Sequence, residues 1–184
     1  MMNNGRILYF SVMDKNLYTS DWINLDGNHV HKSAIVHPNV KMGKGNWIGA
    51  FCVIGGNGEM RGVNQDDFKG HVEIGDKNII SEFVSIQRPY EKGRSTKIGD
   101  NNIIMRGSHL GHDTKVGNGC EICTGVILGG YSVIEDGVKL KLGVIVRNRV
   151  TIGIGAIIGM GSIVTKDVPA GEVWYGSPAK KSEK

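Results

Sequence analysis

The sequence predicts an all-β protein, a β-solenoid whose chain turns a corner every six residues. Aliphatic residues, half of them followed by glycine, open twelve consecutive six-residue blocks between residues 98 and 169. A helix would repeat its apolar positions about every 3.6 residues and a flat strand every second residue, so neither explains this period. The fifth position of each block forms a second column of small or β-branched residues. The 28 glycines are spread along the chain, which favours a repeat over a linker.

The elements follow from where the six-residue phase starts, breaks and stops. Residues 1–30 lie outside the repeat and are expected to form an N-terminal cap, with RILYF as a strand over the open first coil, because terminal repeats need capping. The solenoid itself is expected over 31–170, and a short tail over 171–184. Two polar interruptions are expected to project from a corner as loops, at residues 57–71 and 87–97.

The composition limits the classes of partner. The formal charge of +4 is mild, and no basic run or aromatic stripe indicates nucleic-acid binding. The opening MMNNGRILYF lacks the pattern of a signal peptide, and no apolar stretch is long enough to span a membrane. The three cysteines make no even disulfide framework, and Cys52 and Cys120 occupy the small inward column. We therefore expect a cytoplasmic protein that binds small molecules.

Residues 30–181 resemble the hexapeptide-repeat acyltransferase family. The segment "HVEIGDKNIISEFVSIQRP", continued by "GSHLGHDTKVG", is similar to the UDP-N-acetylglucosamine acyltransferases of lipid A synthesis. The His-Asp pair and the ending "TKDVPAGEVWYGSPAKK" are similar to nucleotide-amino-sugar N-acetyltransferases. The resemblance implies a left-handed parallel β-helix with three six-residue sides per coil, although most parallel crossovers are right-handed. It also implies a homotrimer with active sites in the clefts between subunits.

The same resemblance suggests the catalytic and donor-binding residues. It implies that His112 is the catalytic base, that Asp113 assists it, and that Gly130 contacts acetyl-CoA. Steps of one coil continue the His112 column through Asn148 to Lys166, about 14 Å away if coils stack at about 4.8 Å. This column is expected to be a groove for acyl-CoA, with the thioester near His112. The rest of the expected donor-binding set is Gly161, Ala179 and Lys180.

Acyl transfer from a thioester requires these residue types. The nucleophile must lose a proton, and histidine titrates near neutrality. A backbone N–H can stabilise the oxyanion of the tetrahedral intermediate, and Gly130 has no side chain to block its approach. Asp113 could orient the imidazole, because two adjacent residues can both point outward at a corner.

The acceptor-binding residues are expected to be Asp66, Gln87 and His109. Asp66 lies in "GVNQDDFKG", which resembles the Q-D-x-K loop by which the lipid A enzyme holds its nucleotide sugar. That enzyme has histidines where this chain has Gln87 and Tyr131, and it carries a C-terminal helical domain that this sequence does not show. These departures favour a short acyl group carried by CoA.

The sequence therefore predicts an acetyl-CoA-dependent acetyltransferase of a nucleotide-linked sugar, most naturally an amino sugar used for bacterial surface polysaccharide. Three alternatives stay open: acyl-carrier-dependent O-acylation of UDP-N-acetylglucosamine, a γ-type zinc carbonic anhydrase, and a non-catalytic scaffold in which His112 is a solvated loop residue. No metal is expected, because the two histidines are three residues apart and lack a third ligand in the regular coils. Four cations either form a solvated face or attract CoA phosphates, namely Lys139, Lys141, Arg147 and Arg149.

Overall fold

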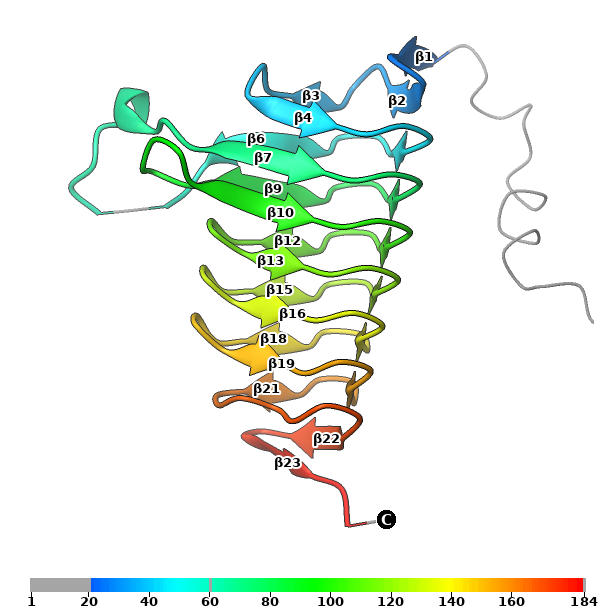
Figure 1. Ribbon diagram of the computed structural model, residues 1–184, viewed down its shortest axis with the longest axis vertical. Helices are drawn as coiled ribbons and strands as arrows, with labels where there is room; N and C mark the ends of the chain where they lie inside the picture. Colours follow the sequence, from blue (N-terminus) through cyan, green and yellow to red (C-terminus); the bar gives the residue numbers. More distant parts are fainter. Residues whose placement is uncertain (1–20, 60, 184) are drawn as a thin grey trace, which may run out of the picture.

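The computed structural model, which describes residues 21–59 and 61–183, is a left-handed parallel β-helix (Figure 1). Three parallel sheets run along it and form the sides of a triangular prism. Sheet A contains β1 (Trp22–Leu25), β2 (Asn28–His31), β5 (Trp47–Ile48), β8 (Ile79–Ile80), β11 (Ile103–Ile104), β14 (Glu121–Ile122), β17 (Lys139–Leu140), β20 (Ile157–Ile158), β22 (Val173–Gly176) and β23 (Ala179–Lys181).

The other two sheets are built in the same way. Sheet B contains β3 (Ile35–Val36), β6 (Val53–Asn57), β9 (Ser85–Arg88), β12 (His109–Leu110), β15 (Ile127–Leu128), β18 (Ile145–Val146) and β21 (Ile163–Val164). Sheet C contains β4 (Val40–Met42), β7 (His71–Ile74), β10 (Ser95–Ile98), β13 (Lys115–Val116), β16 (Val133–Ile134) and β19 (Thr151–Ile152). Each coil passes through sheets A, B and C in turn.

The strand register confirms a coil of 18 residues. Ile104 pairs with Ile122, and Leu110 pairs with Leu128, each 18 residues further along. Both predicted inward columns are buried throughout the twelve blocks, from Ile98 to Val164 for the first position and from Asn102 to Val168 for the fifth. The period predicted the core because each side of the prism places its first and fifth residues inside.

From residue 98 to residue 163, each corner is made by a residue with positive φ at the fourth position of its block. In the coils from residue 103 onward, the corners between sheets A and B and between sheets C and A use only glycine there. The corner between sheets B and C instead uses Asp113, Tyr131 and Arg149, with φ of 60°, 63° and 63°. Side chains other than glycine rarely adopt this conformation, so this corner differs from the others.

Two loops project from the corner between sheets B and C, as Figure 1 shows on its left side. Both loops are shorter than expected. The paired strands β6 and β9, and the paired strands β7 and β10, extend into the ranges 57–71 and 87–97. The first loop, residues 58–70, contains the short 3-10 helix η1 (Gln65–Asp67). It packs against the second loop, residues 89–94: Lys69 N donates to the Tyr90 carbonyl at 2.9 Å, and Phe68 is buried against the Tyr90 ring.

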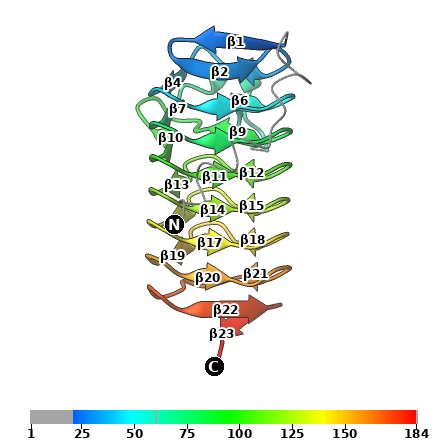
Figure 2. The same cartoon turned by 90° about the vertical axis from the view of Figure 1, so that its right-hand side faces the viewer.

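An antiparallel hairpin closes each end of the described helix (Figure 2). At the N-terminal end, β1 folds back on β2; the expected RILYF strand lies outside the described residues. At the C-terminal end, β23 folds back on β22, so the segment expected to be a tail continues sheet A. The Trp174 side chain is buried at this end of the helix, and its Nε1–H donates to the Glu172 carboxylate at 2.7 Å.

Candidate active site

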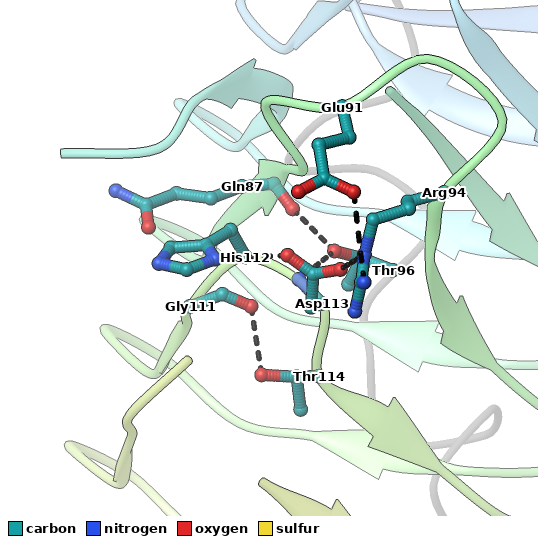
Figure 3. Close-up of polar contacts among 8 residues, drawn as sticks. All are labelled: Gln87, Glu91, Arg94, Thr96, Gly111, His112, Asp113 and Thr114. Carbon is teal, nitrogen blue, oxygen red and sulfur yellow. Dashed lines mark hydrogen bonds and ion pairs between the residues drawn. The ribbon is translucent and has the colours of Figure 1, made fainter. Parts of the chain in front are cut away.

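His112 and Asp113 occupy the corner between sheets B and C, after β12 and before β13. The positive φ of Asp113 turns its carboxylate back toward the ring, so that Oδ2 lies 2.9 Å from His112 Nδ1. The Asp113 side chain is 5% exposed and the imidazole 19%. Figure 3 shows the two side chains at this corner. A carboxylate at Nδ1 holds the proton there and leaves Nε2 free to accept one.

Asp113 is itself held by groups from the second loop and β10. Its Oδ1 accepts a hydrogen bond from Arg94 Nε, and its backbone N–H donates to Thr96 Oγ1 at 2.9 Å. Thr96 is fully buried and donates in turn to the Gln87 carbonyl at 2.7 Å. The Asp113 carboxylate raises the pKa of Arg94, which keeps the guanidinium charged. Sequence reasoning missed Arg94 and Thr96, because both lie where the six-residue phase is interrupted.

Gly130 lies directly beneath the imidazole in the next coil. Tyr131 N–H donates to the His112 carbonyl at 2.9 Å, which confirms that the two corners stack. A Cβ placed on Gly130 would lie 2.8 Å from His112 Nε2 and 2.9 Å from Cε1. The bare backbone therefore leaves room beside the nitrogen that is free to act as a base.

The sequence alone assigned no role to Tyr131, but its side chain contacts the site from the next coil. Its ring meets the His112 ring edge-on, with centroids 5.1 Å apart. The guanidinium carbons of Arg149 and Arg94 lie 4.3 Å and 5.1 Å from the Tyr131 centroid. The three non-glycine corner residues and Arg94 thus form one contiguous group around the imidazole.

The first loop covers His112 from the opposite side. Gly58 is so close that a Cβ there would lie 3.2 Å from His112 Cβ and Cδ2 and 3.2 Å from Phe68 Cε1. His109 lies on the outer side of β12, where its Nδ1 is 2.6 Å from Ser85 Oγ. Burial lowers the pKa of His109, against an opposing effect of Glu59. Figure 3 shows the Gln87 side chain extending in the same direction as the His112 ring.

A pocket of about 680 Å³ lies next to this corner, between the loops and the first coil. Asp66, expected at the acceptor site, lines it, as does Phe68 beside Gly58. Three cations also line it, namely Lys69, Arg88 and Lys92. Arg88 Nε is fixed by Asn57 Oδ1 at 2.8 Å, and Lys69 Nζ by the Asp66 carbonyl at 2.6 Å. The pocket is suited to an anionic ligand.

The expected donor column is only partly continuous. Arg149 N–H donates to the Gly130 carbonyl at 3.1 Å, so Asn148 follows Gly130 in the stack and is exposed. Beyond it the corner changes: the Asp167 carboxylate accepts from Thr151 N at 2.8 Å, and Lys166 Nζ lies 5.2 Å from the Trp174 ring centroid. Lys166 therefore already has an aromatic partner.

The other expected donor residues lie elsewhere on the chain. Gly161 forms a corner between sheets A and B, and Ala179 and Lys180 belong to the C-terminal hairpin of sheet A. Within one chain the structure does not bring these three to the His112 corner. The four clustered cations also divide, because Arg147 and Arg149 lie at the His112 corner, whereas Lys141 pairs with Glu121 at 2.8 Å on sheet A beside Lys139.

Cys52 and Cys120 are buried, as the inward column predicted, and burial raises the pKa of Cys52 to about 11. In the described part of the chain, no group of three or more His, Cys, Asp and Glu side chains is placed to hold a metal ion. Nor does any helix among residues 21–59 and 61–183 have the length and apolar character needed to cross a membrane.

The family described as bacterial transferase hexapeptide (six repeats) matches residues 95–130. An acyl-[acyl-carrier-protein]–UDP-N-acetylglucosamine O-acyltransferase from Thermodesulfovibrio yellowstonii is 37% identical over 87 residues, which cover 42% of this chain and 34% of the relative. The chain thus matches about a third of the length of this curated relative.

Solved structures show the same resemblance over more of the chain. The UDP-N-acetylglucosamine acyltransferase of Francisella novicida has a TM-score of 0.63 and 27% identity, covering 83% of this chain and 69% of its own. A mutant perosamine N-acetyltransferase from Caulobacter crescentus, in complex with CoA and GDP-perosamine, has a TM-score of 0.54 and 25% identity, covering 85% and 57%. The predicted resemblance to hexapeptide-repeat acyltransferases is confirmed.

Proposed function

We propose that this protein transfers an acetyl group from acetyl-CoA to the amino group of a nucleotide-linked sugar, as a step toward a bacterial surface polysaccharide. One observation carries the proposal: His112 is backed by Asp113 at Nδ1, and its Nε2 lies over the bare backbone of Gly130. A base with one free nitrogen beside an open backbone is the arrangement that aminolysis of a thioester needs.

The reaction can be written with these groups. The neutral amine attacks the thioester carbonyl, and His112 Nε2 takes the proton that the nitrogen loses as the C–N bond forms. The C–S bond then breaks, and the His112 imidazolium gives this proton to the departing CoA thiolate, which restores the neutral base. Asp113 stabilises the imidazolium that forms in between.

The acceptor is proposed to occupy the pocket between the two loops. Lys69, Arg88 and Lys92 supply three positive charges for the phosphates of a nucleotide sugar, and Asp66 supplies an acceptor for sugar hydroxyls. Phe68 lines this pocket, and Gly58 packs between Phe68 and His112, so the pocket lies on the loop side of the base. The relative solved with GDP-perosamine supports a nucleotide-sugar acceptor.

The donor is proposed to lie along the same corner below Gly130. Asn148 offers an amide for the pantetheine chain, and Arg147 and Arg149 offer charge for the CoA phosphates. Lys166 stays a proposed phosphate contact that would have to leave the ring of Trp174. Gly161, Ala179 and Lys180 could join the site only from a second copy of the chain.

A homotrimer is proposed for the same reason. The outer face of sheet B exposes a stripe of isoleucines next to the candidate site, Ile127, Ile145 and Ile163, which are 43%, 40% and 37% exposed. An apolar stripe of this kind is suited to burial against another subunit. The partner would then complete the cleft at His112.

A second candidate function is O-acylation of UDP-N-acetylglucosamine from an acyl carrier protein, because the 37% identical relative has that activity in its name. The two functions are separated by incubating the protein with acetyl-CoA or a long-chain acyl carrier protein, together with a panel of amino-sugar and N-acetyl-sugar nucleotides. Mass spectrometry should find one added acetyl group on an amino-sugar nucleotide. Acylation only from the carrier protein, or only on an N-acetylated sugar, would refute the proposal and support the second function.

A further inference from the structure

Arg94 is the charged residue that connects the second loop to the catalytic pair. It is 44% exposed, yet its guanidinium has two fixed contacts: Nε donates to Asp113 Oδ1, and the guanidinium carbon lies 5.1 Å from the Tyr131 ring centroid. A weaker ion pair to Glu91, at 3.7 Å, belongs to the same loop. The contact to Asp113 uses one carboxylate oxygen and leaves the other for His112.

Tyr131 supports this arrangement from a positive-φ corner position of the kind that the other two corners of its coil give to glycine. The corners just before and just after it along the chain use Gly125 and Gly137, with φ of 72° and 70°. A tyrosine with φ of 63° is retained here although glycine would fit more easily. Its ring contacts Arg94, Arg149 and the edge of His112, so the side chain rather than the backbone explains its presence.

We infer that Arg94 and Tyr131 are positioning residues: Arg94, held between the Asp113 carboxylate and the Tyr131 ring, fixes Asp113 so that His112 keeps its proton on Nδ1 and presents Nε2 above Gly130. The inference rests on the proposed function of His112 as a base. It adds that the positive charge of Arg94 offsets part of the negative charge of Asp113. The carboxylate therefore attracts a proton to the imidazole less strongly than it would alone.

The charges that face His112 give the direction of the effect. Asp113 acts from its own corner, Arg94 from the second loop, and Tyr131, with Arg149 against it, from the coil below. The first loop contributes the uncharged Gly58 and Phe68, with Glu59 following, whose charge acts on His109. Removing Arg94 deletes a positive charge and leaves Asp113 unshared, so the ring should gain its proton at higher pH.

The test compares Arg94→Gln with the unaltered protein by NMR of histidines labelled at the ring carbon Cε1, with His112→Gln identifying the His112 signal. The titration of His112 should move to higher pH in Arg94→Gln. The acid side of the transfer-rate profile should move in the same direction, with a loss on the order of tenfold at pH 7 and less at pH 9. Unchanged titration and an unchanged rate profile would overturn the assignment of Arg94.

Tyr131 is tested by Tyr131→Gly and Tyr131→Phe. The glycine variant keeps the corner folded, because neighbouring corners use glycine, and it should lose transfer roughly tenfold or more and shift the His112 titration as Arg94→Gln does. The phenylalanine variant keeps the ring and should behave as the unaltered protein. Phe83→Gly is the matched control: Phe83 also has positive φ (60°) and is 58% exposed, but lies at the corner between sheets A and B.

Equal behaviour of Tyr131→Gly and Phe83→Gly would overturn the role of Tyr131. The two kinds of failure are distinguishable. If no acceptor is acetylated, the proposed function fails, but the NMR titrations still show whether Arg94 and Tyr131 control the imidazole. If transfer occurs and depends on His112 while the titrations do not move, only the positioning role fails.

Discussion

Gly130 is the residue whose missing side chain matters most at the candidate site. An added Cβ would lie 2.8 Å from His112 Nε2 and 3.1 Å from the His112 carbonyl oxygen, closer than van der Waals contact permits. Gly130→Ala should therefore displace the imidazole and reduce turnover by on the order of a hundredfold, since misplacement of a catalytic group by about 1 Å costs that much. The positive-φ restriction does not apply here, so the fold should persist.

Steady-state kinetics and circular dichroism would check this prediction. Thr124→Ala is the matched control, because Thr124 precedes a positive-φ residue at the next corner as Gly130 precedes Tyr131, but it is exposed and distant from His112. An alanine variant at Gly130 with full activity would show that Nε2 does not work over this backbone.

At the scale of residues, the sequence predicted the positions of those side chains that follow the six-residue repeat. His112, Asp113 and Gly130 were placed at stacked corners because their spacing follows the 18-residue coil. Arg94 reaches Asp113 from a loop in which no period applies, so its contact is visible only in three dimensions. Lys166 lies at the expected 18-residue spacing from Asn148. Its surroundings could not be predicted, because Trp174, which it contacts, belongs to a hairpin outside the repeat.

At the scale of elements, the two loops form the proposed acceptor pocket. Lys92 lines it from the second loop and is exposed, so Lys92→Gln should leave the coils intact. Loss of one charge-assisted contact costs about 1.5–3 kcal/mol, so the KM for the nucleotide sugar should rise by roughly tenfold or more while the KM for acetyl-CoA stays unchanged. Initial-rate measurements with each substrate varied would show this.

Lys115→Gln is the control for Lys92→Gln, because Lys115 is an exposed lysine on β13 that does not line the pocket. A rise in the KM for acetyl-CoA instead would place the donor, not the acceptor, between the loops. The loop boundaries themselves were predicted a few residues too wide. The sequence shows only where the repeat of aliphatic residues stops. Strand pairing depends on the backbone, and so β6 and β9 continue to pair beyond that point.

At the scale of the whole molecule, the isoleucine stripe of sheet B should be buried between subunits. Light scattering should give a mass near three times the 19.9 kDa of the chain. Ile145→Asp should break this assembly, since a carboxylate facing an apolar interface is costly to bury. Ile154→Asp is the control, because Ile154 is 59% exposed at a different corner. A trimer that survives Ile145→Asp would mean that another face joins the subunits.

The fold could be read from the sequence almost completely, because one repeating pattern controls the core, the corners and the coil length. The assembly could not be read in this way, because an outward isoleucine on a strand such as β18 does not indicate what covers it. The proposed completion of the cleft at His112 by a second subunit therefore depends on the outer face of sheet B, whose residues the six-residue repeat does not determine.

The most direct test of the account is acetyl transfer from pH 5.5 to 9 by the unaltered protein and by His112→Ala, with the best amino-sugar nucleotide as acceptor. The unaltered rate should rise with pH through the histidine range. His112→Ala should lose about 10²–10⁴ in turnover and keep only the titration of the amine itself. Acetyl-CoA should still bind, because the groove below Gly130 is untouched. His29→Ala, an exposed histidine on β2, serves as control. Near-normal turnover by His112→Ala would contradict the assignment of His112 as the base.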